Sequence, residues 1–121
     1  MSRRSWLGRL FVVVLAVLML TACSDDGSGS TELKTVQVSI SGGETDPSNG
    51  RVEVSRNQPI DLVITADEPG AIHIHAAPEE FSRDFAGGDE DTVVKLQFDR
   101  PGQIAVELHD PDRVILTFVV R

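Results

Sequence analysis

The chain has 121 residues, of which 19 are acidic and 11 are Lys or Arg, so its formal net charge is −8 at pH 7. This length suits one small domain, and the negative charge excludes nucleic-acid binding by phosphate neutralisation and electrostatic attraction to anionic lipid headgroups. The only cysteine is Cys23, which excludes a disulfide within the chain.

The N-terminal segment is typical of an export signal. Arg3, Arg4 and Arg9 flank the start of an uninterrupted apolar stretch of eleven residues, 10–20. Such a stretch is too short to cross a bilayer as a helix, which takes about 20 residues. It fits the apolar region of a signal peptide instead.

The apolar stretch ends in an aliphatic residue, two small residues and a cysteine, Leu20-Thr21-Ala22-Cys23. This order resembles the lipobox of bacterial lipoproteins. The resemblance implies a thioether-linked diacylglycerol on Cys23 and removal of the signal peptide, residues 1–22. We therefore expect a lipid-anchored protein on the extracytoplasmic face of the cell membrane.

The export route has two interpretations. Residues 2–7 (SRRSWL) resemble the twin-arginine export motif, with Trp6 where that motif usually has Phe. The resemblance implies that the protein crosses the membrane already folded. Two arginines near the N-terminus suit the general signal-peptide route equally well, so both routes stay open.

A polar linker follows Cys23. Residues 24–34 (SDDGSGSTELK) are rich in Gly and Ser and carry two adjacent aspartates. A coil of this composition and length spans on average about 17–20 Å. We expect residues 23–34 to form the lipidated cysteine and a flexible linker that holds the domain just off the membrane.

From Thr35 onward the sequence predicts one β-sandwich domain over residues 35–121. Apolar and polar residues alternate with a period of two, which indicates strands with one buried face. The alternating apolar positions are Val36, Val38, Ile40, Val52, Val54, Ile60, Leu62, Ile64, Ile72, Ile74, Val94, Leu96, Phe98, Ile104, Val106 and Leu108. Gly, Pro and Asp turn signals separate these runs. About seven short strands of this kind indicate an antiparallel sandwich.

Two segments depart from this alternation. Residues 79–86 (EEFSRDFA) suit one or two helical turns. Residues 114–120 are apolar on both faces except at Thr117, which indicates a strand that is buried on both sides.

Three histidines suggest a metal site. His73 and His75 lie two residues apart on one predicted strand, so both side chains point to the same face, while Ile72 and Ile74 point to the other. His109 ends another predicted strand. Three imidazoles that converge can bind Cu(II) or Zn(II).

Nearby carboxylates could complete such a site. Asp110, Glu79 and Glu80 are close in sequence to the histidines. Each could supply an oxygen ligand or hold an imidazole in place through a hydrogen bond.

The region from residue 51 to 121 resembles a cupredoxin-like domain, an all-β Greek-key sandwich. One landmark is the stretch DLVITADEPGAIHIHA, which has His73 where that family places its first copper-ligand histidine. The other is FDRPGQIAVELHDPDRVILTFVV, which resembles the family's Pro-Gly turn, penultimate strand, ligand loop and final strand. The resemblance implies the fold and a relation to copper.

The sequence departs from the blue-copper members of that family. Those members have a Cys at the end of the penultimate strand, where this chain has Leu108 or His109, and a His and a Met in the following loop. Residues 110–112 (DPD) provide neither ligand. Because a blue-copper site needs a thiolate, we expect metal handling rather than electron transfer.

The sequence therefore leads to two functional hypotheses. The first is a membrane-anchored protein that binds copper, zinc or another divalent metal through His73, His75 and His109. The second is a metal-free interaction module that presents its acidic loop, residues 84–91, to a protein of the cell envelope. No nucleophile elbow, phosphate loop or catalytic triad pattern is present, so we expect no enzymatic activity.

The predicted lipid anchor can be tested by replacing the sulfur of Cys23 with oxygen. A Cys23→Ser chain should stay uncleaved and unlipidated, because a hydroxyl cannot replace the thiol in the thioether. Metabolic labelling with a radioactive fatty acid should mark the native protein and not the variant. Label retained by the variant would contradict the lipoprotein hypothesis.

Overall fold

The computed structural model describes residues 30–121, which form nine strands. The predicted signal peptide, Cys23 and most of the linker lie outside the described residues. The strands are β1 (Lys34–Ser41), β2 (Glu44–Asp46), β3 (Gly50–Val54), β4 (Ile60–Ala66), β5 (Gly70–Ala76), β6 (Glu79–Phe85), β7 (Asp91–Leu96), β8 (Gly102–Leu108) and β9 (Arg113–Val120). Residues 30–121 contain no helix long and apolar enough to cross a membrane.

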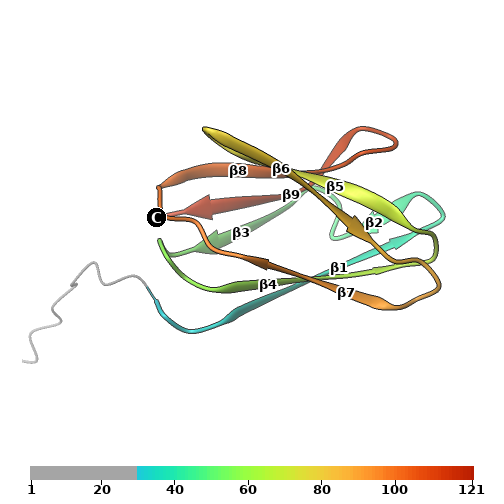
Figure 1. Cartoon of the computed structure of the whole chain (residues 1–121), viewed down its shortest axis with the longest axis horizontal. Helices are drawn as coiled ribbons and strands as arrows, with labels where there is room; N and C mark the ends of the chain where they lie inside the picture. Colours follow the sequence, from blue (N-terminus) through green and yellow to red (C-terminus); the bar gives the residue numbers. More distant parts are fainter. Residues whose placement is uncertain (1–29) are drawn as a thin grey trace, which may run out of the picture.

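The strands form two sheets that pack face to face. The order is β2-β1-β4-β7 in the four-stranded sheet and β3-β9-β8-β5-β6 in the five-stranded sheet. The five-stranded sheet is the upper layer in Figure 1 and the four-stranded sheet the lower layer. The all-β sandwich is therefore as predicted, but the expected antiparallel pairing is incomplete, because β1 pairs with β4 and β3 with β9 in parallel.

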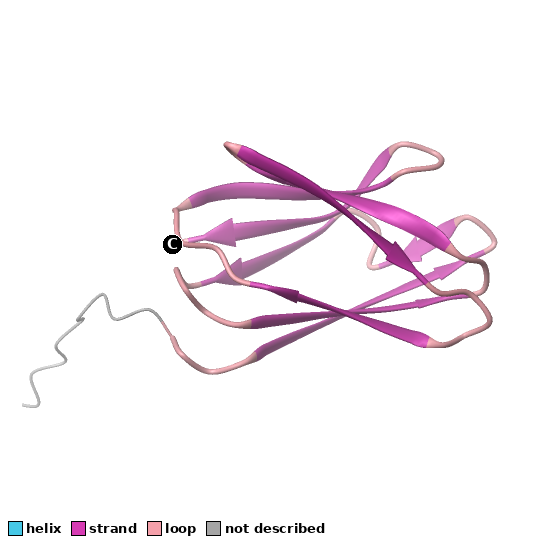
Figure 2. Ribbon diagram, in the orientation of Figure 1, coloured by secondary structure: helices cyan, strands magenta, loops and turns pink. Residues whose placement is uncertain are grey.

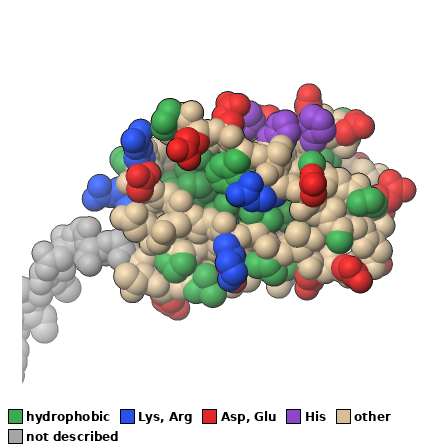
Figure 3. All heavy atoms as spheres, viewed as in Figure 1, with side chains coloured by type: hydrophobic (Ala, Val, Ile, Leu, Met, Phe, Trp, Pro, Cys, Tyr) green, Lys and Arg blue, Asp and Glu red, His purple; other side chains and the backbone are tan. Residues whose placement is uncertain are grey.

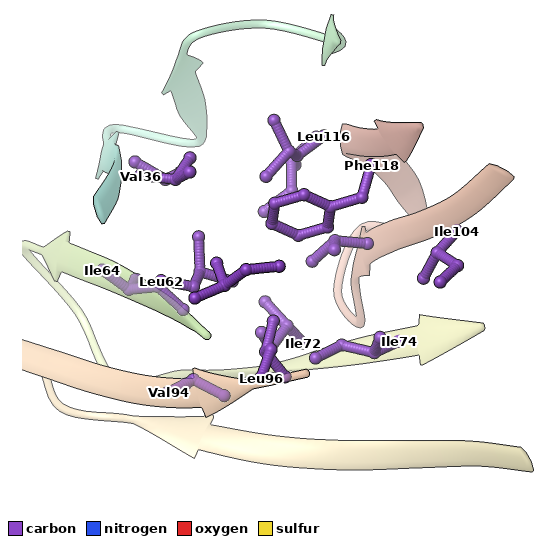
Figure 4. Packing of buried hydrophobic residues seen from close by; sticks show 14 of the residues in the cluster. Val36, Leu62, Ile64, Ile72, Ile74, Val94, Leu96, Ile104, Leu116 and Phe118 are labelled. Carbon is purple, nitrogen blue, oxygen red and sulfur yellow. The ribbon is translucent and has the colours of Figure 1, made fainter. Parts of the chain in front are cut away.

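The period-two alternation forms the core. In β4, every second residue from Ile60 to Ala66 is buried, and β5 alternates in the same way. The inward side chains of the two sheets meet in a single apolar cluster (Figure 4). Phe98 and Phe118 pack within it with ring centroids 5.6 Å apart. All strands and all buried apolar side chains of the described region lie within residues 34–120, so this segment carries a complete core.

The segment predicted as helical turns is strand β6 (Figure 2). Its two aromatic residues, Phe81 and Phe85, are four positions apart, a spacing that fits one face of a strand as well as one face of a helix. Pairing along the whole of β5 selects the strand. Strand β2 is also additional to the expected seven, because its three residues include no apolar residue.

The last strand is not buried on both sides. Ile115 and Leu116 are consecutive buried residues, but Val114 is exposed and Thr117 and Val119 are only half-buried. A β-bulge between β8 and β9 at this point adds one residue to β9 and turns two neighbouring side chains toward the core. The outer face of the five-stranded sheet therefore stays open to solvent.

One buried polar side chain fixes the start of the domain. The Gln58 side-chain oxygen accepts a hydrogen bond from the Ser55 N–H at 2.9 Å, and its amide nitrogen donates to the Glu32 carbonyl at 2.9 Å. The Lys34 N–H also donates to the Pro59 carbonyl. The chain therefore enters β1 from a fixed point beside the turn between β3 and β4.

The strand register gives a stability prediction. Ile74 and Leu96 are buried, and Gln97 is exposed. Ile74→Ala and Leu96→Ala should each lower the free energy of unfolding by about 2–5 kcal/mol, while Gln97→Ala, which loses one exposed hydrogen bond, should cost no more than about 1 kcal/mol.

Circular dichroism during urea unfolding is the suitable measurement, because the chain has no Tyr and its one Trp, Trp6, lies in the predicted signal peptide. Equal losses at positions 96 and 97 would contradict the register of β7.

Candidate functional site

The alternation of β5 places two histidines on the outer face of the five-stranded sheet. Ile72 and Ile74 point into the core and are 0% exposed. His73 and His75 consequently point outward and are half-buried. Figure 3 shows the histidines as one group on the upper surface of the domain.

His109 joins this group from the end of β8. Its N–H donates to the Ala71 carbonyl at 3.0 Å, which extends the pairing of β5 and β8 by one residue. Leu108 points into the core, so His109 shares the outer face with Glu107, as the alternation predicts. This register makes His109 the diagonal neighbour of His73, and the two rings stack with centroids 4.6 Å apart and planes at 29°.

His75 is held by two carboxylates. Its Nδ1 lies 3.0 Å from Glu80 Oε1 and its Nε2 lies 3.0 Å from Glu107 Oε2. Carboxylate oxygens only accept hydrogen bonds, so both hydrogen bonds form together only when His75 is the doubly protonated imidazolium. The cation therefore links β5 to both of its neighbours, β6 and β8.

This environment changes the protonation of His75. The hydrogen bond that His75 donates to Glu80 is the largest cause that raises the pKa of His75 above the ordinary value of 6.5, and Glu107 acts in the same direction, while partial burial opposes both. A nitrogen that donates to a carboxylate has no lone pair for a metal. His75 must break these bonds before it can act as a ligand.

The structure brings two of the three predicted ligands together. His73 and His109 are stacked, whereas the rings of His73 and His75 lie 6.5 Å apart at 61°. Within residues 30–121, no group of three or more His, Cys, Asp or Glu side chains is arranged to hold a metal ion. The metal role of His73, His75 and His109 stays a prediction.

One of the three carboxylates expected near the histidines takes a predicted role. Glu80 does hold an imidazole, that of His75. Glu79 and Asp110 form no hydrogen bond or ion pair with a histidine among the described residues. Two further carboxylates lie beside the histidines. Glu107 binds His75 and could be expected on this face because it lies two residues before His109 on an alternating strand, and Asp112 Oδ1 lies 4.0 Å from His109 Nδ1.

The surface beside His73 is a shallow hollow of about 160 Å³, lined by His73, His75, Glu80, Phe81 and Ser82. Ser82 lies directly opposite His73 in the register of β5 and β6. The His73 ring thus borders this hollow, and the exposed ring of His109 stacks against it.

The residues do not fit a copper–thiolate centre. The end of β8 carries Leu108, which is 5% exposed and packs in the core. The only cysteine of the chain is Cys23, and both methionines precede it. Imidazole and carboxylate groups are the candidate ligands of the described region, and these suit Cu(II) or Zn(II).

Solved structures similar to this one are cupredoxins and copper-binding domains. Auracyanin A, a blue copper protein from Chloroflexus aurantiacus, aligns with 74% of this chain and 100% of its own at a TM-score of 0.56 and 13% identity. A variant of amicyanin with Cu(I) aligns over 72% and 82% of the two chains at a TM-score of 0.52 and 12% identity. The metal-binding domain of the Cu(I)-exporting P-type ATPase of Streptococcus pneumoniae aligns with 77% of this chain and 99% of its own, at a TM-score of 0.52 and 11% identity.

These similarities show a cupredoxin-like fold, as the sequence resemblance implied. No protein-family model matches the sequence. No curated protein matches it significantly.

The paired carboxylates predict a pH-dependent stability. Because the pKa of His75 is raised in the folded protein, its contribution is fully present below the unfolded value of about 6.5 and is lost as the pH rises through the folded value. His75→Gln should therefore destabilise the domain more at about pH 6 than at about pH 8.5.

Urea unfolding of both proteins at the two pH values measures this difference. An NMR titration of the His75 ring should give a midpoint above 6.5. A midpoint below that value, or the same loss of stability at both pH values, would contradict the carboxylate–imidazolium arrangement.

Proposed function

We propose that this chain is a lipid-anchored, extracytoplasmic protein that binds a divalent metal, Cu(II) or Zn(II), through His73 and His109. Its role is metal handling rather than electron transfer, and it acts without catalysing a reaction. The observation that carries the proposal is the stacked pair of imidazoles on an open sheet face, 4.6 Å between centroids. The similarity of the fold to copper proteins supports it.

The chemistry of the pair suits metal binding. Neutral imidazole is a common ligand for both ions, with metal–nitrogen distances of about 2.0–2.1 Å. His73 and His109 come from neighbouring strands whose backbones are hydrogen-bonded, so their spacing is set by the sheet. A rotation of each ring about its side-chain bonds is enough to turn two ring nitrogens toward one ion.

The remaining features of the site favour handling over electron transfer. A metal on the outer face of the sheet is reached directly from solvent, since His109 is 60% exposed. Nitrogen and oxygen ligands without a thiolate do not form the blue-copper centre used for electron transfer. The resemblance of Leu20-Thr21-Ala22-Cys23 to a lipobox supports anchoring at the membrane surface.

One observation favours the metal-free interaction module as a second candidate. The turns at the end of the sandwich away from the C terminus, residues 42–43, 67–69, 86–90 and 109–112, contain neither Lys nor Arg. They contain six carboxylates, Asp67, Glu68, Asp89, Glu90, Asp110 and Asp112. A pocket of about 410 Å³ lies there and is lined in part by Asp67, Glu68 and Asp110. A basic surface on an envelope protein would match this end.

Calorimetric titration separates the two candidates. Cu(II) and Zn(II) should bind residues 24–121 with micromolar affinity at neutral pH, and His73→Ala or His109→Ala should weaken binding at least about tenfold. The Cu(II) form should show only weak visible absorption, because no thiolate is available. Binding should also weaken in acid, where protons compete for the imidazoles.

Gln97→Ala is the control, since Gln97 is an exposed residue that follows β7, a strand of the sheet that does not carry the histidines. It should change the affinity less than threefold. If neither ion binds at micromolar protein concentration, or if both alanine variants bind as the native domain does, the metal function is wrong and the interaction module stands.

A further inference from the structure

The His73–His109 pair is an incomplete site within one molecule. Zinc and copper sites in proteins usually have three or four protein ligands. Glu80 and Glu107, two carboxylates on this face, are hydrogen-bonded to His75, and Asp112 lies 4.0 Å from His109 Nδ1. With no third group converging on the pair among residues 30–121, an ion held by one molecule keeps open positions directed away from the sheet.

The surroundings of the pair allow a second protein surface to approach. On the outer face, His73 lies between Ser82 of β6 and Glu107 of β8, and His75 lies between Glu80 of β6 and Ala105 of β8. The Ala71 carbonyl accepts the His109 N–H. Ser82, Ala105 and Ala71 have small side chains, and no other layer of residues 30–121 covers this sheet face (Figure 2). A second protein surface can therefore reach the exposed His109 ring and the hollow beside His73.

We infer that a second copy of this chain completes the site, so that one Zn(II) or Cu(II) ion is held by His73 and His109 from each of two molecules. This inference rests on the proposed metal function of the pair. A two-fold axis through the ion brings the same surface of both copies together. The resulting four nitrogen ligands match tetrahedral Zn(II) or tetragonal Cu(II).

Charge makes this association depend on the metal. The described region contains 17 Asp and Glu but only eight Lys and Arg, so two copies repel each other. A divalent cation between the two faces offsets part of this repulsion, and its removal restores it. His73 and His75 lie on the outer face of the sheet, and His109 lies where this face meets the end of the sandwich. The histidines form one group on the surface (Figure 3), so the same group on a second copy can approach it face to face.

Sedimentation velocity of tag-free residues 24–121 with Zn(II) tests the inference. Residues 34–120 hold every strand and the complete core, so this form retains the fold. We expect a monomer in EDTA and a dimer at half an equivalent of Zn(II), with a calorimetric stoichiometry of one ion per two chains. A large excess of Zn(II) should return the protein to the monomer, because the His73–His109 pair of each molecule then binds its own ion.

His73→Ala and His109→Ala should each abolish the Zn(II)-dependent dimer, while Gln97→Ala, an exposed position beside the other sheet, should keep it, with circular dichroism confirming the fold of all three. Binding of one ion per chain to a protein that stays monomeric at every ratio would overturn the dimer and leave the metal function intact. If the protein binds no Zn(II) at all, both the dimer and the proposed metal function are wrong. A dimer that persists in EDTA or in the alanine variants would overturn the inference, because the metal would not be its cause.

Discussion

One-sided burial is the constraint on which the rest of this structure depends. Each sheet has a single covered face, and side chains along a strand alternate between the two faces. Because Ile72 and Ile74 point into the core and are 0% exposed, the side chains of His73 and His75 must point to the solvent face. The same rule places Leu108 inside and His109 outside. The imidazoles of this cupredoxin-like domain consequently lie on the outer face of a sheet, and its interior is purely apolar at the end of β8.

Local patterns predicted the elements whose residues alternate cleanly, such as β4 and β5. They failed where two arrangements satisfy the same pattern. Phe81 and Phe85 fit a strand and a helix equally well, and pairing with β5 decides between them. The bulge in β9 and the parallel pairs were not predictable, since alternation shows which face a residue occupies but not which strand lies beside it.

The same limit applies to the candidate site. The shared face of His73 and His75 follows from their spacing, and the position of His109 follows from its strand. The ion pairs of His75 depend on Glu80 and Glu107, which come from two different neighbouring strands. Only the register between these strands shows that both carboxylates reach one imidazole. Residues that are equivalent in the sequence thus become chemically different, since His75 is hydrogen-bonded to two carboxylates while His73 and His109 form an accessible pair.

The entry of the chain into β1 has a mechanical consequence. The Gln58 side chain donates a hydrogen bond to the Glu32 carbonyl and holds it beside the turn that precedes β4. Strand β1 then runs parallel to β4 through seven consecutive residue pairs, from Lys34 with Ile60 to Ile40 with Ala66. When the N-terminal segment is pulled along the axis of β1 while the rest of the domain is held, the hydrogen bonds between β1 and β4 are loaded in shear. They must then break together and not one after another. A domain held by its N-terminus would therefore resist being drawn open by force applied through its own attachment.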